Sequence, residues 1–174
     1  MNETKPQVYL FTDGSVNPQR GIGFGAYLLL DRLDYLHAKE KKAIELKKFT
    51  NTSSTKLELE TLLWALNDSD LKKCKIIVYT DCQNIIGLQD RRDKFEKNNY
   101  ITGKGKVIKN HELYKEFFKI IDTLDCEFIK VKGHKKTSTK DEIDDIFTLV
   151  DKETRNALRD RDLYRFQTKN QVKE

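Results

Sequence analysis

The sequence has few cysteines, and their pattern excludes several kinds of site. Cys74, Cys82 and Cys126 are odd in number, widely separated and without a C-x-x-C pair. This pattern gives no support to a zinc site, a redox pair or a disulfide framework. We therefore expect three reduced cysteines that are mostly buried.

Long apolar runs are also missing. The longest, such as AYLLL and KIIVY, fall far short of the ~20 residues that a membrane helix needs. The opening MNETKPQV has no signal-peptide core. These absences predict a cytoplasmic protein with no membrane segment. The sequence implies no protein partner, and we expect a monomer.

Proline is scarce, with two residues in 174, and neither a Pro-rich linker nor an internal repeat interrupts the chain. The length suits one domain. We expect a single domain over residues 1–174, with a core of about 7–160 and a frayed tail, QTKNQVKE. Charged residues make up 35% of the chain, against ~25% in an average globular protein, which predicts a soluble protein with a heavily charged surface.

Positive charge is abundant and unevenly placed. The net charge is +5, and segments 39–48, 91–109 and 130–140 are each strongly cationic. A basic rim around the acidic centre described below would suit a metal-using enzyme that acts on a polyanion. The alternative is that each lysine run is only a solvated face.

The first part of the chain predicts an antiparallel meander. Residues 7–12 and 22–30 are typical of strands, and a turn rich in Gly, Pro and Asn joins them. Residues 43–49 alternate and predict a third strand, which follows a charged bend near 39–42.

The second part alternates between helices and strands. Leucines at helical spacing predict a helix after TNTSST, with Ser54 or Thr55 as its N-cap. Residues 90–109 are expected to be irregular. The remaining expected elements are strands at 75–80 and 126–131 and helices at 82–89, 111–124 and 141–164. Together they predict one mixed α/β sheet with helices on both faces and a ligand site at the strand ends.

Two aspartates stand where predicted strands end. Asp13 and Asp81 each follow a Thr and an apolar run, so neighbouring parallel strands would bring them side by side. Ionised carboxylates this close repel each other unless a cation or a proton lies between them. Mg²⁺ prefers such oxygen ligands, so the pair predicts a divalent metal site. The alternative is that each Asp starts a turn or caps a helix, as Asp81 could for the helix that follows it.

Four segments carry a family resemblance. FTDGSVNPQRGIGFGAYLL, TKLELETLLWAL, IIVYTDCQNI and VKGHKKTSTKDEIDDIFTLVDKETRNAL resemble, in order, the successive motifs of type 1 ribonuclease H over residues 7–160. The resemblance implies a five-stranded mixed sheet, with three antiparallel strands and then two parallel ones. It also implies endonucleolytic cleavage of the RNA strand of RNA/DNA hybrids, leaving 5′-phosphate and 3′-hydroxyl ends.

The resemblance also implies the residues that carry the chemistry. Two Mg²⁺ ions, replaceable by Mn²⁺, would be held by Asp13, Glu58, Asp81 and Asp151. Glu60 ranks lower than Glu58 because it points to a different side of the helix. Asp144, two turns before Asp151 on the same face, stays open as the alternative fourth acid.

His134 in VKGH matches the family's mobile-loop histidine. Its unperturbed pKa near 6.5 would suit a proton shuttle. The alternative is a surface histidine with no role.

Substrate contacts are expected where polar groups could sense 2′-hydroxyls in the minor groove. The residues implied are Gly14, Ser15, Asn17, Ser53, Thr55 and Lys56. The alternative for the Ser/Thr cluster is a helix cap and a turn. Gly21, Gly23 and Gly25 are expected to leave room for a backbone or a duplex.

Residues 91–109 occupy the place of the family's basic protrusion. The segment is shorter, and Phe95 and Tyr100 stand where tryptophans are usual, which predicts weaker or differently placed binding of the DNA strand. The rival functions are a catalytically silent hybrid-binding domain and another two-metal nuclease of the superfamily. A phospho-acceptor at Asp81 is disfavoured by the opening meander.

Overall fold

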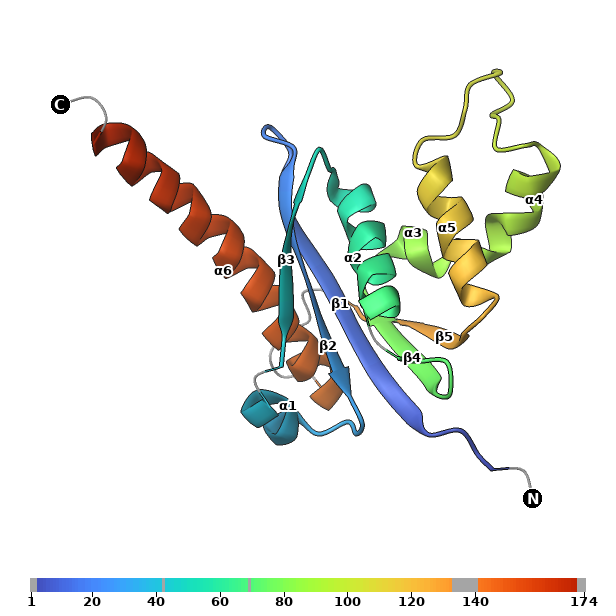
Figure 1. Ribbon diagram of the computed structural model, residues 1–174, viewed down its shortest axis with the longest axis horizontal. Helices are drawn as coiled ribbons and strands as arrows, with labels where there is room; N and C mark the ends of the chain where they lie inside the picture. The colour runs from blue at the N-terminus through green and yellow to red at the C-terminus, as the bar shows by residue number, and fades with distance from the viewer. Residues whose placement is uncertain (1–2, 42, 69, 133–140, 172–174) are drawn as a thin grey trace.

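The computed structural model describes residues 3–41, 43–68, 70–132 and 141–171, with side chains up to Asp160. The sheet has five strands in the spatial order β3-β2-β1-β4-β5 (Figure 1). β1, β2 and β3 pair antiparallel, whereas β4 is parallel to β1 and β5 to β4. The predicted five-stranded mixed sheet is confirmed. The strand bounds are β1 Gln7–Asn17, β2 Ile22–Leu30, β3 Glu45–Thr50, β4 Lys75–Thr80 and β5 Asp125–Lys130.

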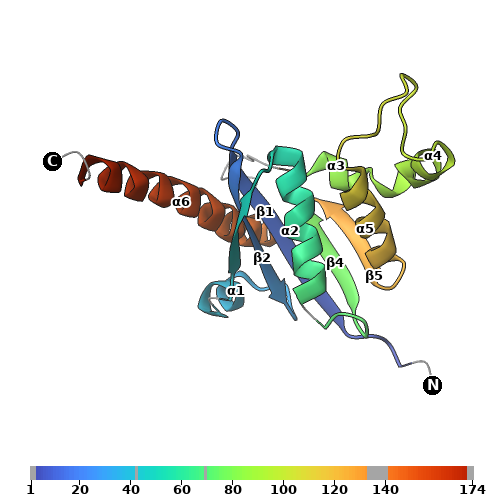
Figure 2. The same ribbon diagram turned by 45° about the horizontal axis from the view of Figure 1, so that its top comes forward.

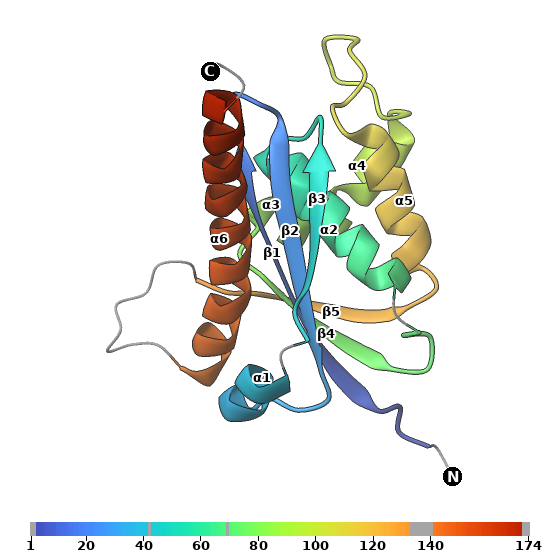
Figure 3. The ribbon, with the colours of Figure 1, turned by 60° about the vertical axis from the view of Figure 1, so that its left-hand side comes forward.

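Helices cover both faces of the sheet, as predicted. Figure 3 shows α6 along one face, with α1 at its lower end, and α2 and α5 on the other face. None of the helices in the described ranges is long and apolar enough to cross a membrane. The helix bounds are α1 Tyr35–Lys41, α2 Ser54–Asp68, α3 Gln83–Ile86, the 3₁₀ turn η1 Gln89–Arg91, α4 Arg92–Lys97, α5 His111–Ile121 and α6 Glu142–Gln171.

Strand β1 separates two apolar cores and directs its side chains to both. Leu10 belongs to the core beneath α2 and α5, and Phe11 to the core beneath α6 and α1. Successive side chains of a strand point to opposite faces, and the pairing of β1 with β2 runs without interruption from Tyr9 to Asn17. Asp13 and Ser15 therefore lie on the α6 face, and Gly14 lies on the α2 face.

Strand β1 is longer than the sequence predicted. It continues to Asn17 because its pairing with β2 extends that far, so the prediction that the strand ends before Asp13 is wrong. The parallel ladder to β4 does stop earlier, at the pair Phe11–Tyr79. Asp13 thus lies two residues beyond the last parallel pair, where the edge of β1 is free of β4.

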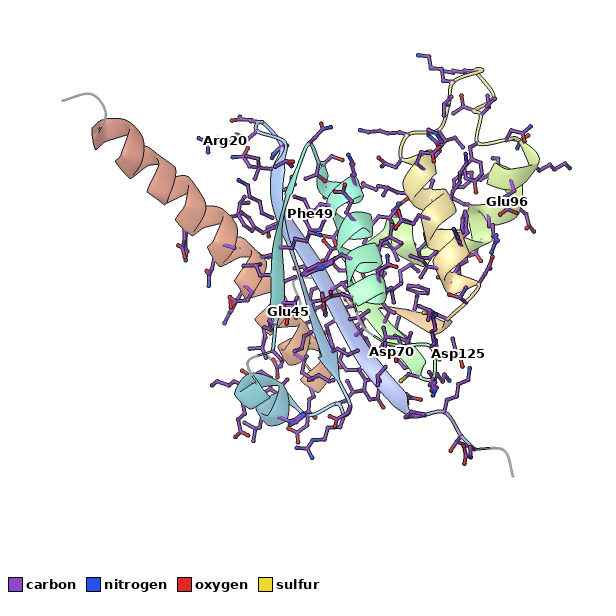
Figure 4. The ribbon with its side chains drawn as sticks, in the orientation of Figure 1. Arg20, Glu45, Phe49, Asp70, Glu96 and Asp125 are labelled. Atoms are coloured by element: carbon purple, nitrogen blue, oxygen red, sulfur yellow. The ribbon has the colours of Figure 1, made fainter. Side chains whose placement is uncertain are left out.

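Helix α2 packs directly over glycines of β1 and β2. A Cβ on Gly25 would be 2.0 Å from Thr61 Oγ1, and one on Gly23 would be 2.6 Å from Leu57 Cδ2. The sequence left open whether a backbone or a duplex approaches these glycines, and at Gly23 and Gly25 helix α2 of the same chain does so. Gly21 instead has a positive φ of 61° in the turn between β1 and β2, which Arg20 marks in Figure 4.

Two local expectations were wrong. Residues 39–41, which were expected in a charged bend, belong to helix α1, which buries Ala38. The expected irregular segment 90–109 contains η1 and α4, and Phe95 of α4 stacks on Tyr114. Helix α6 continues to Gln171 and projects beyond the sheet in Figures 1 and 2, and residues 142–171 contain no Gly or Pro to stop it. The frayed tail from residue 167 stays a prediction.

The cysteines are free, as predicted, but their burial is only intermediate. Cys74 directly precedes β4, and Cys126 is the second residue of β5. Cys82 lies at the opposite end of β4, directly after Asp81.

Candidate active site

Three carboxylates from three elements meet at one edge of the sheet. Oxygens of Asp13 on β1, Glu58 on α2 and Asp81 after β4 all lie within 4.8 Å of one another. The β1–β4 register, continued by two residues past Phe11 and Tyr79, sets Asp13 opposite Asp81, as the sequence predicted. Asp13 and Glu58 are 5% and 8% exposed, and Asp81 is more accessible.

Asp151 approaches the same cluster from α6. Its side chain is within hydrogen-bonding contact of Asp13. The four acids line a cavity of about 350 Å³. The other lining residues are Gly14, Ser15, Ser54, Thr55, Cys82 and Arg155.

Gly14 lets the acids from the two faces of the sheet come together. Its backbone N–H donates a hydrogen bond to the carboxylates of both Asp13 and Glu58. A Cβ at this position would be 2.9 Å from Leu57 and 3.5 Å from Glu58 Oε1. A side chain at this position would therefore press on Leu57 of α2, next to the point where Glu58 approaches Asp13.

Burial and mutual repulsion disfavour the ionised form of the carboxyl groups in the cluster. Burial is the main cause that raises the pKa of Asp13 to about 8, and the nearby charge of Asp81 is the next. The pKa of Glu58 is raised well above its usual value by burial and then by Asp13 and Asp81. The Gly14 N–H lowers both pKa values but does not offset the repulsion. The cluster therefore requires a proton or a cation for its stability.

The donor atoms fit a hard divalent cation. All four side chains offer carboxylate oxygens, the ligands that Mg²⁺ and Mn²⁺ prefer. Glu58 Oε2 is buried and has no hydrogen-bond partner within the described part of the chain. A buried anionic oxygen without a donor is costly, and a bound cation would remove that cost. Asp13, Glu58, Asp81 and Asp151 are therefore the candidate ligands.

The two alternative acids, Glu60 and Asp144, interact with residues outside the acidic cluster. Glu60 accepts a hydrogen bond of 2.8 Å from Thr52 Oγ1 and lies 3.8 Å from Lys56 Nζ. Asp144 forms a reciprocal capping box with Asp141, since each side chain accepts the other's backbone N–H at 2.9 and 3.1 Å. The cavity lining includes neither Glu60 nor Asp144.

The predicted substrate-binding residues divide into two groups. Gly14, Ser15 and Thr55 line the cavity. Two of the others bind nearby backbone groups instead: Asn17 Oδ1 accepts the N–H of Gln19 at 3.1 Å, and Lys56 Nζ donates to the Asn51 carbonyl at 2.8 Å.

Ser53 precedes α2, and its carbonyl accepts the Leu57 N–H at 2.8 Å. Helix α2 begins at Ser54, so Ser54 and Thr55 lie in its first turn and the cap position falls one residue earlier than predicted. His134 lies outside the described residues.

Three cavity residues were not predicted from the sequence. Ser54 and Cys82 adjoin predicted site residues, and burial raises the pKa of the Cys82 thiol, which keeps it protonated. Arg155 Nε donates a 2.8 Å hydrogen bond to Asp151 Oδ1. Its spacing of four residues from Asp151 on one helix is a signal that the sequence does carry.

Comparison with known proteins gives one consistent result. The family model described as RNase H matches residues 5–153. The chain is 31% identical over 153 residues to "Ribonuclease H" of Caldicellulosiruptor saccharolyticus, which covers 86% of this chain and 99% of that protein. It is 33% identical over 135 residues to "Ribonuclease H" of Clostridium botulinum, with 74% and 84% of the two chains covered. It is also 31% identical over 147 residues to "Ribonuclease H" of Acetivibrio thermocellus, with 82% and 92% covered. The chain belongs to the ribonuclease H family.

Proposed function

We propose that the protein is a metal-dependent endoribonuclease that hydrolyses the RNA strand of RNA/DNA hybrids. The observation that carries the proposal is the meeting of Asp13, Glu58 and Asp81, with Asp151 beside Asp13, at one open cavity. The relatives named ribonuclease H support the substrate class. Cytoplasmic location and a monomeric state stay predictions from the sequence.

The four acids would hold two Mg²⁺ ions, for which Mn²⁺ could substitute. Such a pair supplies a water of lowered pKa and neutralises charge at the attacked phosphorus and at the leaving 3′-oxygen. Asp13 occupies the centre of the cluster, where it can serve both ions. Glu58 and Asp81 would then hold the ion that serves the leaving group, and Asp151 would hold the ion that serves the nucleophile. The products would carry 5′-phosphate and 3′-hydroxyl ends.

The remaining cavity residues would orient the substrate. The Gly14 N–H, which donates to the carboxylates of Asp13 and Glu58, would help to orient both side chains. Ser54 and Thr55 place polar groups in the cavity at the start of α2, where they could sense a 2′-hydroxyl across the minor groove. His134 is retained as the proposed proton shuttle.

The proposal is tested with end-labelled RNA/DNA, RNA/RNA and DNA/DNA duplexes of one sequence, each in Mg²⁺, Mn²⁺ or EDTA. We expect cleavage of the RNA strand of the hybrid alone, and none in EDTA. Tight hybrid binding without cleavage in either metal would indicate a silent binding domain. Cleavage of the DNA duplex would indicate another nuclease of the superfamily.

Glu58→Gln should reduce hybrid cleavage by at least about 100-fold, because removing a ligand charge weakens metal binding. Glu60→Gln is the matched control, two residues away on the same helix and outside the cavity. It should keep kcat within about twofold. The comparison is made by initial rates at saturating Mg²⁺, and equal losses in the two variants would contradict the assignment of Glu58.

Asp151→Asn and Asp144→Ala should separate activity from stability. Asp151→Asn should lose most cleavage and keep its Tm. Asp144→Ala removes the oxygen that accepts the Asp141 N–H in the capping box at the start of α6, which should cost about 1 kcal/mol or roughly 2–4 °C of Tm, and it should keep its activity. Rates and thermal melts of both variants check this, and the reverse pattern would make Asp144 the fourth acid.

A further inference from the structure

A pair of hydroxyls joins β1 to α6 beside the carboxylates. Ser15 Oγ and Thr154 Oγ1 are 3.0 Å apart although the residues are 139 positions apart in the sequence. Thr154 is fully buried, at 0% exposure. A buried hydroxyl is retained at low cost only when it is hydrogen-bonded.

The hydrogen bonds of this pair have one direction. Thr154 Oγ1 donates to the Asp151 carbonyl oxygen at 2.9 Å, and a carbonyl can only accept. The single hydroxyl proton of Thr154 is therefore used, so Ser15 must donate to Thr154. The two hydrogen bonds therefore lead from the Ser15 hydroxyl through the Thr154 hydroxyl to the backbone carbonyl of Asp151.

These two hydrogen bonds fix the position of the turn of α6 that carries Asp151. Asp13 and Ser15 are two residues apart on one face of β1, and Asp151 and Thr154 are one turn apart on α6. The rest of the contact includes apolar side chains such as Ile146 and Val150, whose packing is not directional. The Asp151 carboxylate is held within its own helix by Arg155, so its distance from Asp13 depends on where α6 lies on β1.

We propose that Thr154 is a positioning residue, which with Ser15 holds Asp151 in register with Asp13 so that the two carboxylates can share bound metal. The inference rests on the proposed function. In this proposal the Ser15 side chain binds Thr154 of α6 and does not contact the hybrid. This differs from the substrate-binding role predicted from the sequence.

The test compares Thr154→Val, which keeps the shape and loses the hydroxyl, with Thr154→Ser, which keeps the hydroxyl, and with Ser15→Ala. Two quantities are measured: hybrid cleavage as a function of Mg²⁺, and the Mg²⁺ concentration that gives half of the thermal stabilisation without substrate. For Thr154→Val and Ser15→Ala we expect about a tenfold higher Mg²⁺ midpoint and a tenfold lower kcat, the size typical of residues that orient metal ligands. KM for the hybrid should be unchanged, and Thr154→Ser should resemble the wild type.

A wild-type Mg²⁺ midpoint in Thr154→Val, even with a lowered Tm, would overturn the proposal. A raised KM in Ser15→Ala with an unchanged Mg²⁺ midpoint would also overturn it, because Ser15 would then contact the hybrid. If the wild type binds Mg²⁺ but cuts no hybrid, the proposed function fails, and the Mg²⁺ midpoints still test the positioning role.

Discussion

Asp13→Asn is expected to abolish hybrid cleavage and at the same time make the metal-free protein more resistant to heat. Asp13 lies at the centre of the acidic cluster and is 5% exposed. Removing its charge removes a metal ligand, and it also removes the repulsion with Asp81 and Glu58. Asparagine has nearly the same size, so the packing of β1 should not change.

The gain in stability should depend on pH with a defined sign. The pKa of Asp13 rises from 3.8 in the unfolded chain to about 8 in the fold. A raised carboxyl pKa gives stability that is present below pH 3.8 and is lost as the pH rises to about 8. The variant should therefore exceed the wild type most at pH 8 and above, and the two should converge near pH 4. Even one pKa unit corresponds to ~1.4 kcal/mol, or roughly 3–5 °C of Tm.

Thermal melts from pH 4 to pH 9, in EDTA and in Mg²⁺, check this prediction. Mg²⁺ should stabilise the wild type and have a smaller effect on Asp13→Asn. Asp70→Asn is the control, since Asp70 is exposed and precedes β4, at the end of the sheet opposite to the cluster (Figure 4). A large loss of stability in Asp13→Asn would instead place this acid in a structural network.

The order of the sheet could be predicted because each strand carries a local signal. Apolar runs and turn residues marked the strands within about two residues for β2 to β5. The length of β1 could not be predicted, because Gly14 and Ser15 have little strand propensity and are held by pairing with Gly25 and Phe24. Helix α1 was missed because a short charged segment is typical of a loop as well.

The site was only partly predictable from the sequence, because one of its residues depends on how the helices pack on the sheet. Asp13 and Asp81 follow from strand ends and parallel register. Asp144 and Asp151 share one helix face, two turns apart, so periodicity alone cannot choose between them. The choice depends on where α6 crosses β1, which is a property of the packed structure, and Asp151 is the one that lies in the cavity. His134 stays a prediction, since it lies outside the described residues.

The close approach of α2 to the sheet is the other feature on which the site depends. Gly14 and Gly25 are paired neighbours on β1 and β2. Leu57 lies over Gly14, and Thr61 lies over Gly25. The closest of these contacts is at Gly25, so a side chain there should displace α2, and Glu58 with it.

Gly25→Ala should be the most destabilising of the substitutions considered. The new Cβ would be 2.0 Å from Thr61 Oγ1 and 2.9 Å from both Thr61 Cβ and Cγ2. Thr61 is fully buried, and its hydroxyl donates to the Leu57 carbonyl at 2.8 Å, so the side chain has no free direction in which to turn. Overpacking of this kind costs up to ~3 kcal/mol, whereas the entropy that alanine removes from the unfolded chain returns only ~0.4–1 kcal/mol. The steric cost exceeds the gain, and α2 has to move away from β2.

Tm should fall by roughly 4–10 °C, and cleavage should fall with it because Glu58 moves together with α2. Gly103→Ala is the matched control, since a Cβ there would meet nothing within 4 Å. The double variant Gly25→Ala/Thr61→Ala should recover part of both losses, because it removes Oγ1 and Cγ2 and leaves only the 2.9 Å contact with Cβ. A Gly25→Ala protein as stable and as active as Gly103→Ala would mean that α2 adjusts without displacing Glu58. Recovery of stability without recovery of activity in the double variant would mean that the site tolerates less displacement of α2 than the fold does.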